Sequence, residues 1–112
     1  MLNRGMYKLV FFVPHDRAET VKEAVFATGA GGSGRYDRCS FETEGVGQFR
    51  PLPGSTPFIG SHNAVERVPE LRVEVLCDET QVEPAIAAMK NAHPYEVPAF
   101  EVYRLVNFGG SA

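Results

Sequence analysis

Apolar and polar residues repeat along this chain with two different periods, and these periods predict its strands and helices. Residues 7–13 are mostly aromatic or branched and end at Pro14, which is typical of a strand buried on both faces. Residues 71–77 alternate between apolar and polar side chains, as a half-buried strand does. Residues 100–108 are again rich in apolar side chains and predict a last strand.

Two other segments carry apolar residues at helical spacing. Each begins with a residue pair suited to cap a helix: Asp16 with Glu19, and Thr80 with Glu83. The first helix is expected to stop at Gly29, because glycine adopts the left-handed backbone that ends helices, and the second is expected to end near Ala92. The apolar stripes are Val21, Ala24, Val25 and Thr28 in the first segment, and Val82, Ile86 and Met89 in the second.

The middle of the chain predicts extended structure followed by a loop. Residues 36–41 alternate in the manner of a strand, and a second extended piece, 46–52, follows Glu44-Gly45, which favours a hairpin. Residues 51–60 contain three prolines and two glycines, so they cannot form a helix and are expected to be a loop.

This order of elements predicts an α+β, ferredoxin-like (split βαβ) sandwich with an inserted hairpin or loop region between its two halves. We expect one domain over residues 1–112, with a core at about 7–106 and a tail at 107–112. Both helices are expected on one face of the sheet. Strand 7–13 carries apolar side chains on both of its faces, so something must cover the second face. A homo-oligomer is favoured over a cover supplied by the inserted segment.

Composition and charge narrow the classes of partner. The 112 residues are 44% apolar and 22% charged, which fits one globular domain. The net charge is −3 and basic residues are scattered, so nucleic acid is not expected as a partner. No run of apolar residues suits a membrane span or a secretory signal, which predicts a cytoplasmic protein. Cys39 and Cys77 form no CxxC pair, and both are expected to be reduced, partly buried thiols.

The glycine-rich stretch 29–34 has the letters of a dinucleotide-binding motif, GxGxxG, but it follows a predicted helix instead of a strand. Its position favours a helix stop and a close approach of two backbones. A nest of backbone amides that binds an anion, with Arg35 as the counter-charge, is the alternative.

The sequence His93-Pro94-Tyr95-Glu96 is the densest polar cluster, and its histidine and carboxylate are groups that carry protons or bind metals. The other histidines, His15 and His62, lie in different predicted loops, so a histidine at a helix end that holds a loop is favoured over a metal site.

The remaining candidates lie in the middle of the chain. Ser40, Ser55 and Cys39 have no nucleophile motif around them, so no catalytic residue is predicted. Arg50 and Ser55 belong either to a binding loop or to a stiff loop that packs against a neighbouring subunit.

Several motifs together resemble a known family, the Nif-three-like dinuclear-metal-centre hexameric proteins, and specifically their inserted middle domain. The matching residues are Gly29-Ala30-Gly31, Gly34, Tyr36 and Cys39-Ser40-Phe41; Gly45, Gly47, Phe49 and Pro51; Gly54-Ser55, Pro57 and Ile59-Gly60; and His93-Pro94-Tyr95-Glu96 with Pro98-Ala99.

The resemblance covers residues 7–106 and implies a fold similar to CutA and PII-like trimeric proteins, hence a homotrimer. In the larger family the insert is thought to cap a toroidal hexamer, whose paired metal ions are held by flanking halves that this sequence lacks. The resemblance therefore transfers no metal ligand to this chain.

We expect, from residues and resemblance together, an oligomeric, non-enzymatic binding or regulatory module without a cofactor. Its partners would be further copies of itself and a small molecule or another protein. The candidate ligand-binding residues are Gly31, Gly34, Tyr36, Arg50, Ser55, His93, Tyr95 and Glu96. A divalent-metal binder of the CutA type, using His93 with His15 or His62 and Glu96 from separate chains, is the alternative, and a hydrolase is the third hypothesis.

Overall fold

Four antiparallel strands form one sheet in the computed structural model, which describes residues 5–106. The strands are β1 (Met6–Pro14), β2 (Phe41–Phe49), β3 (Glu66–Asp78) and β4 (Phe100–Leu105), in the order β2-β3-β1-β4. The helices are α1 (Ala18–Phe26), which follows a short 3-10 turn, η1 (His15–Arg17), and α2 (Val82–Ala92). The expected tail, 107–112, and the end of the strand predicted over 100–108 lie outside the described residues.

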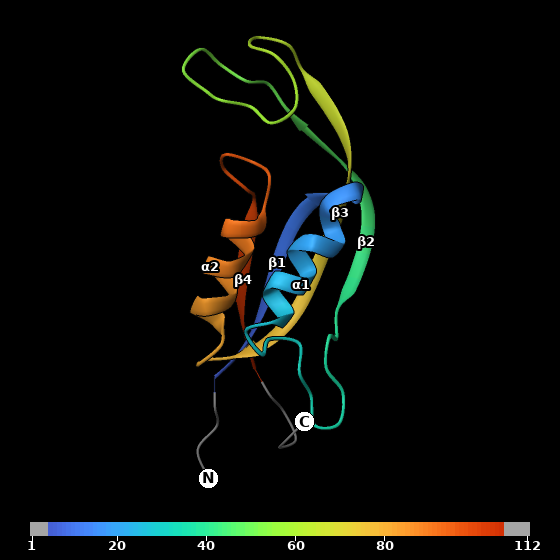
Figure 1. The fold of residues 1–112 in the computed structure, drawn as a ribbon, viewed down its shortest axis with the longest axis vertical. Helices are drawn as coiled ribbons and strands as arrows, with labels where there is room; N and C mark the ends of the chain where they lie inside the picture. The colour runs from blue at the N-terminus through green and yellow to red at the C-terminus, as the bar shows by residue number, and fades with distance from the viewer. Residues whose placement is uncertain (1–4, 107–112) are drawn as a thin grey trace.

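The order of strands is that of the ferredoxin-like fold, because β1 and β3 are central and each half contributes one edge strand. Both helices cover the same face of the sheet (Figure 1). The predicted fold class is therefore confirmed. Neither described helix has the length and apolarity needed to span a bilayer.

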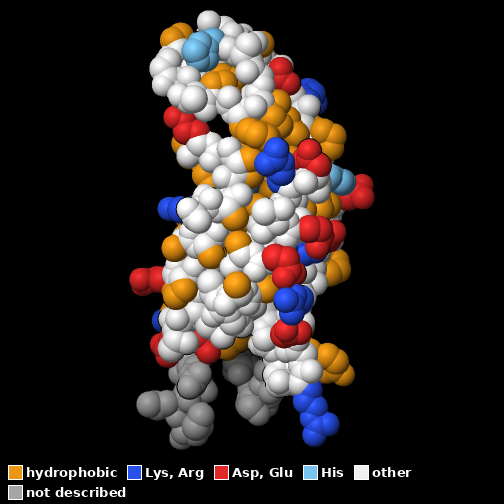
Figure 2. Space-filling model, viewed as in Figure 1, with side chains coloured by type: hydrophobic (Ala, Val, Ile, Leu, Met, Phe, Trp, Pro, Cys, Tyr) orange, Lys and Arg blue, Asp and Glu red, His pale blue; other side chains and the backbone are white. Residues whose placement is uncertain are grey.

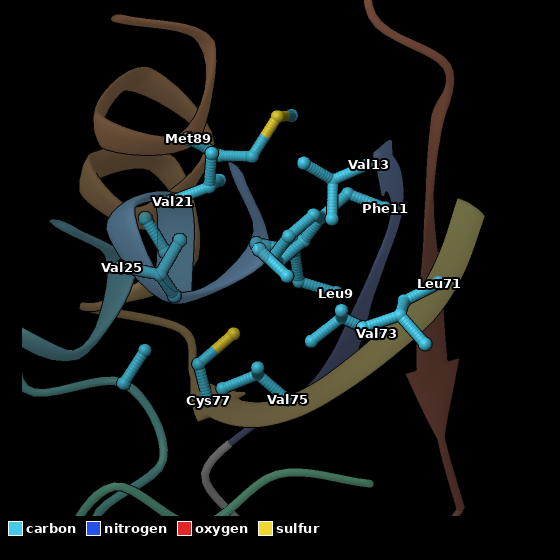
Figure 3. Close-up of a cluster of buried hydrophobic side chains, with 13 residues drawn as sticks. Leu9, Phe11, Val13, Val21, Val25, Leu71, Val73, Val75, Cys77 and Met89 are labelled. Atoms are coloured by element: carbon cyan, nitrogen blue, oxygen red, sulfur yellow. The ribbon is translucent and has the colours of Figure 1, made fainter. Parts of the chain in front are cut away.

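The core lies between the helices and one face of β1 and β3 (Figure 3). Residues of like parity on the two strands face each other across the register: Leu9 pairs with Val75 and Phe11 with Val73. All four are at most 1% exposed. From the predicted stripes the helices contribute Val21, Val25 and Met89, and the core also contains Ala85, which the stripes did not include.

The predicted capping pairs do not cap the helices. Asp16 falls inside η1, so α1 begins after it, and no side-chain cap bond is present at the start of either helix. Before α2, the Asp78 carboxylate accepts the backbone N–H of Thr80 (2.9 Å) and of Gln81 (3.1 Å). The Thr80 hydroxyl also donates to Asp78 (2.6 Å), and α2 begins one residue later than a Thr80 cap requires, because the N-cap position is Gln81.

The predicted hairpin within 36–52 is wrong in its position. Gly45 keeps an extended backbone opposite Glu70, and β2 runs through it without a turn, because pairing with β3 overrides the local turn preference. Residues 37–40 form no strand, and Cys39 is exposed instead of partly buried. Cys77 is buried, and its burial raises the pKa of the thiol.

The hairpin in the structure joins β2 to β3 and projects beyond the helices as an arm (Figure 1). It gives the molecule an elongated shape of 53 × 22 × 21 Å. Its loop, residues 50–65, contains the predicted proline- and glycine-rich loop and forms a lobe at the end of the molecule (Figure 2). The Asn63 N–H donates to the Pro51 carbonyl oxygen (2.6 Å), and His62 Nε2 lies 3.0 Å from the Ser55 carbonyl oxygen. Contacts within the loop therefore hold its shape.

Candidate binding site

The sheet face opposite the helices, called the open face below, carries charged side chains beside exposed apolar ones over the half farther from the arm. Lys8 Nζ lies 3.1 Å from Glu74 Oε1, and Arg72 Nε lies 3.4 Å from Glu74 Oε2. The hydrogen bond from Lys8, with the charges of both cations, holds the pKa of Glu74 below its usual value. Val10 is fully buried beneath this layer. Long charged side chains therefore cover part of the face that we predicted to be bare.

The half of the open face nearer the arm holds a cavity of about 660 Å³. Its floor is the sheet, through Phe12, Gly47 and Glu70, and its walls are two loops, 51–59 and 95–99. Figure 2 shows apolar side chains gathered where the lobe meets the body of the molecule. The inserted segment thus shields this half only in part, and leaves a hollow of the size that proteins use for small molecules.

Aromatic rings form much of the cavity wall. The ring of Tyr95 lies 6.0 Å from that of Phe49 and 6.4 Å from that of Phe58, both in tilted arrangements. Phe12 lies on the floor beside them. Rings from β1, β2 and both loops therefore converge on one apolar space.

Tyr95 is fixed to the floor by a hydrogen bond to Glu70. Its hydroxyl donates to Glu70 Oε2 (2.7 Å), and Glu70 is only 8% exposed. Burial, followed by the bond to the Glu70 carboxylate, raises the pKa of Tyr95, so the phenol stays protonated and remains a donor. The Glu70 carboxyl group lies over Gly47, and a β-carbon at Gly47 would come within 2.3 Å of Glu70 Oε1.

His93 holds the second loop in place. Because the Phe12 carbonyl oxygen can only accept, the Nε2–H of His93 donates to it (2.7 Å), and Nδ1 accepts the Tyr95 N–H (3.1 Å). The side chain is buried, and burial lowers its pKa, against smaller raising effects of the Phe12 carbonyl and Glu70. Both ring nitrogens of a neutral imidazole are therefore occupied.

Glu96 joins the two loops that wall the cavity. Its Oε1 accepts the backbone N–H of Thr56 (3.0 Å). The loop 95–99 thereby fixes the position of the loop at the end of the arm.

The residues singled out from the sequence divide into two groups. Ser55, Tyr95 and Glu96 line the cavity, His93 supports Tyr95 from behind, and Arg50 is exposed on the adjoining chain. Gly31, Gly34 and Tyr36 lie elsewhere: Gly31 donates its N–H to the Leu76 carbonyl oxygen, roughly 20 Å along β3 from Glu70. One chain does not bring the two groups together, and their meeting through a second subunit stays a prediction.

Gly31 itself occupies a close approach of two backbones. Its φ is +82°, and a β-carbon there would lie 2.9 Å from the Cys39 carbonyl oxygen. Two residues earlier, Gly29 (φ +97°) follows α1 where a stop was predicted.

Sequence reasoning missed much of the cavity: Phe12, Phe49, Glu70 and Arg72 were not site candidates, whereas Phe58 belongs to the loop considered as a binding loop. The adjacent glycines and phenylalanines near 45–49 were visible in the sequence, but only the register of β2 on β3 places them over Glu70. For the metal alternative, the described part of the chain has no group of three or more His, Cys, Asp and Glu side chains that could hold an ion.

No family model matches the chain. It is similar to proteins named GTP cyclohydrolase 1 type 2 homolog: 46% identical over 105 residues to the one from Halalkalibacterium halodurans and 48% over 99 residues to the one from Mycobacterium bovis. These matches cover 94% and 88% of this chain. The chain spans only 28% and 26% of the length of those relatives.

Solved structures give the same relationship as these sequence relatives. A Bacillus cereus protein related to NIF3 matches with a TM-score of 0.81 and 39% identity, over 96% of this chain and 27% of that one. CutA from Synechococcus elongatus matches with a TM-score of 0.65 at 18% identity, covering 95% of this chain and 81% of that one. The Bacillus subtilis GlnK–ATP complex matches with a TM-score of 0.62 at 11% identity, covering 94% of this chain and 85% of that one. The last two show the fold alone, and the similarity to NIF3-related proteins and to the CutA fold is confirmed.

One expectation is overturned by these relatives. We expected a non-enzymatic chain, because no catalytic motif stands in its sequence. The relatives carry the name of an enzyme's homologue, GTP cyclohydrolase 1 type 2 homolog, and match this chain over most of its length. The expectation of a non-enzymatic chain is therefore contradicted by the names of its relatives, of which this chain spans 28% and 26%.

Replacing Gly47 by alanine should destabilise the protein by about 1–2 kcal/mol, because the new β-carbon displaces the Glu70 carboxylate from the Tyr95 hydroxyl. Gly45→Ala is the matched control: it lies in the same strand and its β-carbon would meet nothing within 4 Å. Urea unfolding of the two variants measures the difference. Equal unfolding free energies for Gly47→Ala and Gly45→Ala would show that the position of the Glu70 carboxylate contributes nothing to stability.

Stability should fall as the pH drops below the unfolded-state pKa of histidine, about 6.5. The pKa of His93 is lower in the folded protein, so between the two pKa values the unfolded chain binds more protons than the folded one. The contribution of neutral His93 to the unfolding free energy is therefore complete above the unfolded-state pKa. It is lost as the pH falls through the folded-state pKa. Unfolding free energies of wild type and His93→Gln at pH 7.5, 6.5 and 5.5 measure it. The variant should show a flatter dependence, whereas the exposed-site control His62→Gln should keep the wild-type slope.

Proposed function

We propose that this chain is an oligomeric binding and regulatory module, and that its binding site is the cavity on the open face. The observation that carries the proposal is the cavity itself: about 660 Å³, with largely apolar walls built from the sheet and from two loops that hydrogen-bond to each other. Such a hollow is the usual form of a small-molecule site. The hydrogen bonds at Tyr95, His93 and Glu96 hold its walls in place without a ligand.

The relatives' name supports a role beside an enzyme. A module of this kind would serve a protein of the GTP cyclohydrolase 1 type 2 homolog kind as its ligand-sensing part. The cavity itself is poorly suited to GTP. Glu44, Glu70 and Glu96 line it against one guanidinium, Arg72, which Glu74 already pairs, so a triphosphate would meet net repulsion.

Self-association is supported by the surfaces that one copy leaves uncovered. Phe41 and Val46 on β2 are each 67% exposed, and Leu76 on β3 is 47% exposed. The strands β2 and β4 are the two edges of the sheet, and each offers unpaired backbone groups to another chain. Pairing of one copy's edge with a different edge of the next is head-to-tail and closes into a ring. We propose the trimer that the resemblance implies.

Sedimentation should show an oligomer at micromolar concentration, with about three times the chain mass of 12.3 kDa. Val46→Glu should raise the monomer fraction, because it places a charge in the apolar contact. Ala87→Glu adds the same charge on an exposed position of α2 and should leave the assembly intact. A wild-type monomer at this concentration would contradict the proposed assembly.

The neutral dye Nile red should bind the cavity and gain fluorescence. Phe58→Ala should weaken its binding roughly tenfold, since the variant loses apolar contact worth about 1–2 kcal/mol. Leu52→Ala removes an exposed apolar side chain that does not line the cavity, and should bind the dye as wild type does. Identical titrations for both variants would place the dye elsewhere and argue against this site.

A further inference from the structure

We infer that the cavity selects an organic cation, an amine that carries an aromatic or alkyl group, with Glu70 as its counter-ion. The inference rests on the proposed function, since it names the class of ligand for the same cavity. It follows from three features of the cavity: a buried carboxylate without a cation, aromatic walls, and an excess of negative charge.

Glu70 is the first feature. It is 8% exposed, which is rare for a carboxylate unless a cation or several donors compensate its charge. One oxygen, Oε2, accepts the Tyr95 hydroxyl, while Oε1 has no hydrogen-bond or ion-pair partner among residues 5–106. Oε1 lies over Gly47, on the floor of the cavity. A ligand ammonium group at this oxygen would supply the missing charge and donor.

The aromatic walls are the second feature. The negative face of an aromatic ring attracts a cation within about 6 Å of its centre. Two rings of this cavity already bind cations of the chain: the Arg17 guanidinium lies 4.9 Å from the centre of Phe58, and that of Arg72 lies 5.7 Å from the centre of Phe12. The rings of Phe49 and Tyr95 have no such partner among the described residues and border the same space as Glu70. A ligand's ammonium group would fit between them and the carboxylate.

The balance of charge is the third feature. Three carboxylates, those of Glu44, Glu70 and Glu96, line the cavity with a single cationic side chain. That cation, Arg72, lies near two further carboxylates outside the cavity, Glu74 at 3.4 Å and Glu101 at 4.0 Å. The cavity as a whole therefore disfavours anions, while its apolar walls require a hydrophobic portion on the ligand.

Calorimetric titration with phenethylamine, which is an ammonium ion at pH 7.5, tests the inference. Its neutral isostere 2-phenylethanol and the anion phenylacetate are the comparison probes. The ammonium should bind at least tenfold more tightly than the alcohol, and phenylacetate should bind more weakly still. Glu70→Gln, which keeps an acceptor for Tyr95, should abolish the preference for the ammonium. Glu101→Gln changes a carboxylate on the same face outside the cavity and should retain it.

Equal affinity for the ammonium and the alcohol, or a preference unchanged in Glu70→Gln, would overturn the inference. If Nile red binds but the three probes bind with equal affinity, the proposed site stands and only the preference for a cation is rejected. Failure of Nile red and of all three probes would reject both. If instead no probe binds and Glu70→Gln dissociates the oligomer in sedimentation, the carboxylate pairs with a basic side chain of another copy, which also overturns the inference.

Discussion

The hydrogen bond between the Tyr95 hydroxyl and the Glu70 carboxylate is the contact on which the open face depends. It joins the middle of β3 to the loop that follows α2, two segments 25 residues apart. A buried carboxylate is costly, and this bond with the Gly47 backbone beneath it is what keeps the group in place. Without it, the loop 95–99 keeps its bonds to the Phe12 backbone, but the Tyr95 ring loses its anchor on the floor of the cavity.

The apolar side chains on the two faces of the sheet are covered in different ways. On the helix face, β1 and residues 71–77 of β3 contribute apolar side chains, and two helices complete the core. On the open face, Val10 is covered by the long side chains of Lys8, Arg72 and Glu74, which carry their charges outward. Beside the arm, Phe12 is covered by a loop instead, and that loop does not fill the space. The cavity exists because the inserted segment bridges the sheet and does not pack directly onto it.

The sequence was sufficient for the fold, because periods of hydrophobic residues are local and strong. Strand 7–13, both helical stripes and the stop at Gly29 all depend on neighbours within a few residues. The failures have two causes. Gly45 is typical of a turn, yet its pairing opposite Glu70 makes it part of a strand, and this pairing bridges 25 residues. The error at Thr80 is local: Asp78, two residues earlier, binds the Thr80 hydroxyl, and α2 begins after Gln81.

The site was harder to predict, because its chemistry arises from long-range register. Tyr95 and Glu96 stood out as a polar cluster, but Glu70 reads as one of many polar positions in an alternating strand. Only the structure shows that its carboxylate faces Gly47 and a ring of aromatic residues. His93 was ambiguous between a ligand and a support, and its two hydrogen bonds make it a support.

The bond from Thr56 to Glu96 has a consequence for regulation. It ties the loop at the end of the arm to the loop that carries Tyr95, so both walls of the cavity move together. The arm also presents Val46, one of the exposed apolar residues proposed to contact other copies. A ligand that favours one position of the walls must therefore favour one position of the arm, and by linkage assembly must alter the affinity for the ligand to the same extent. In the proposed module, binding and association would then act through one segment.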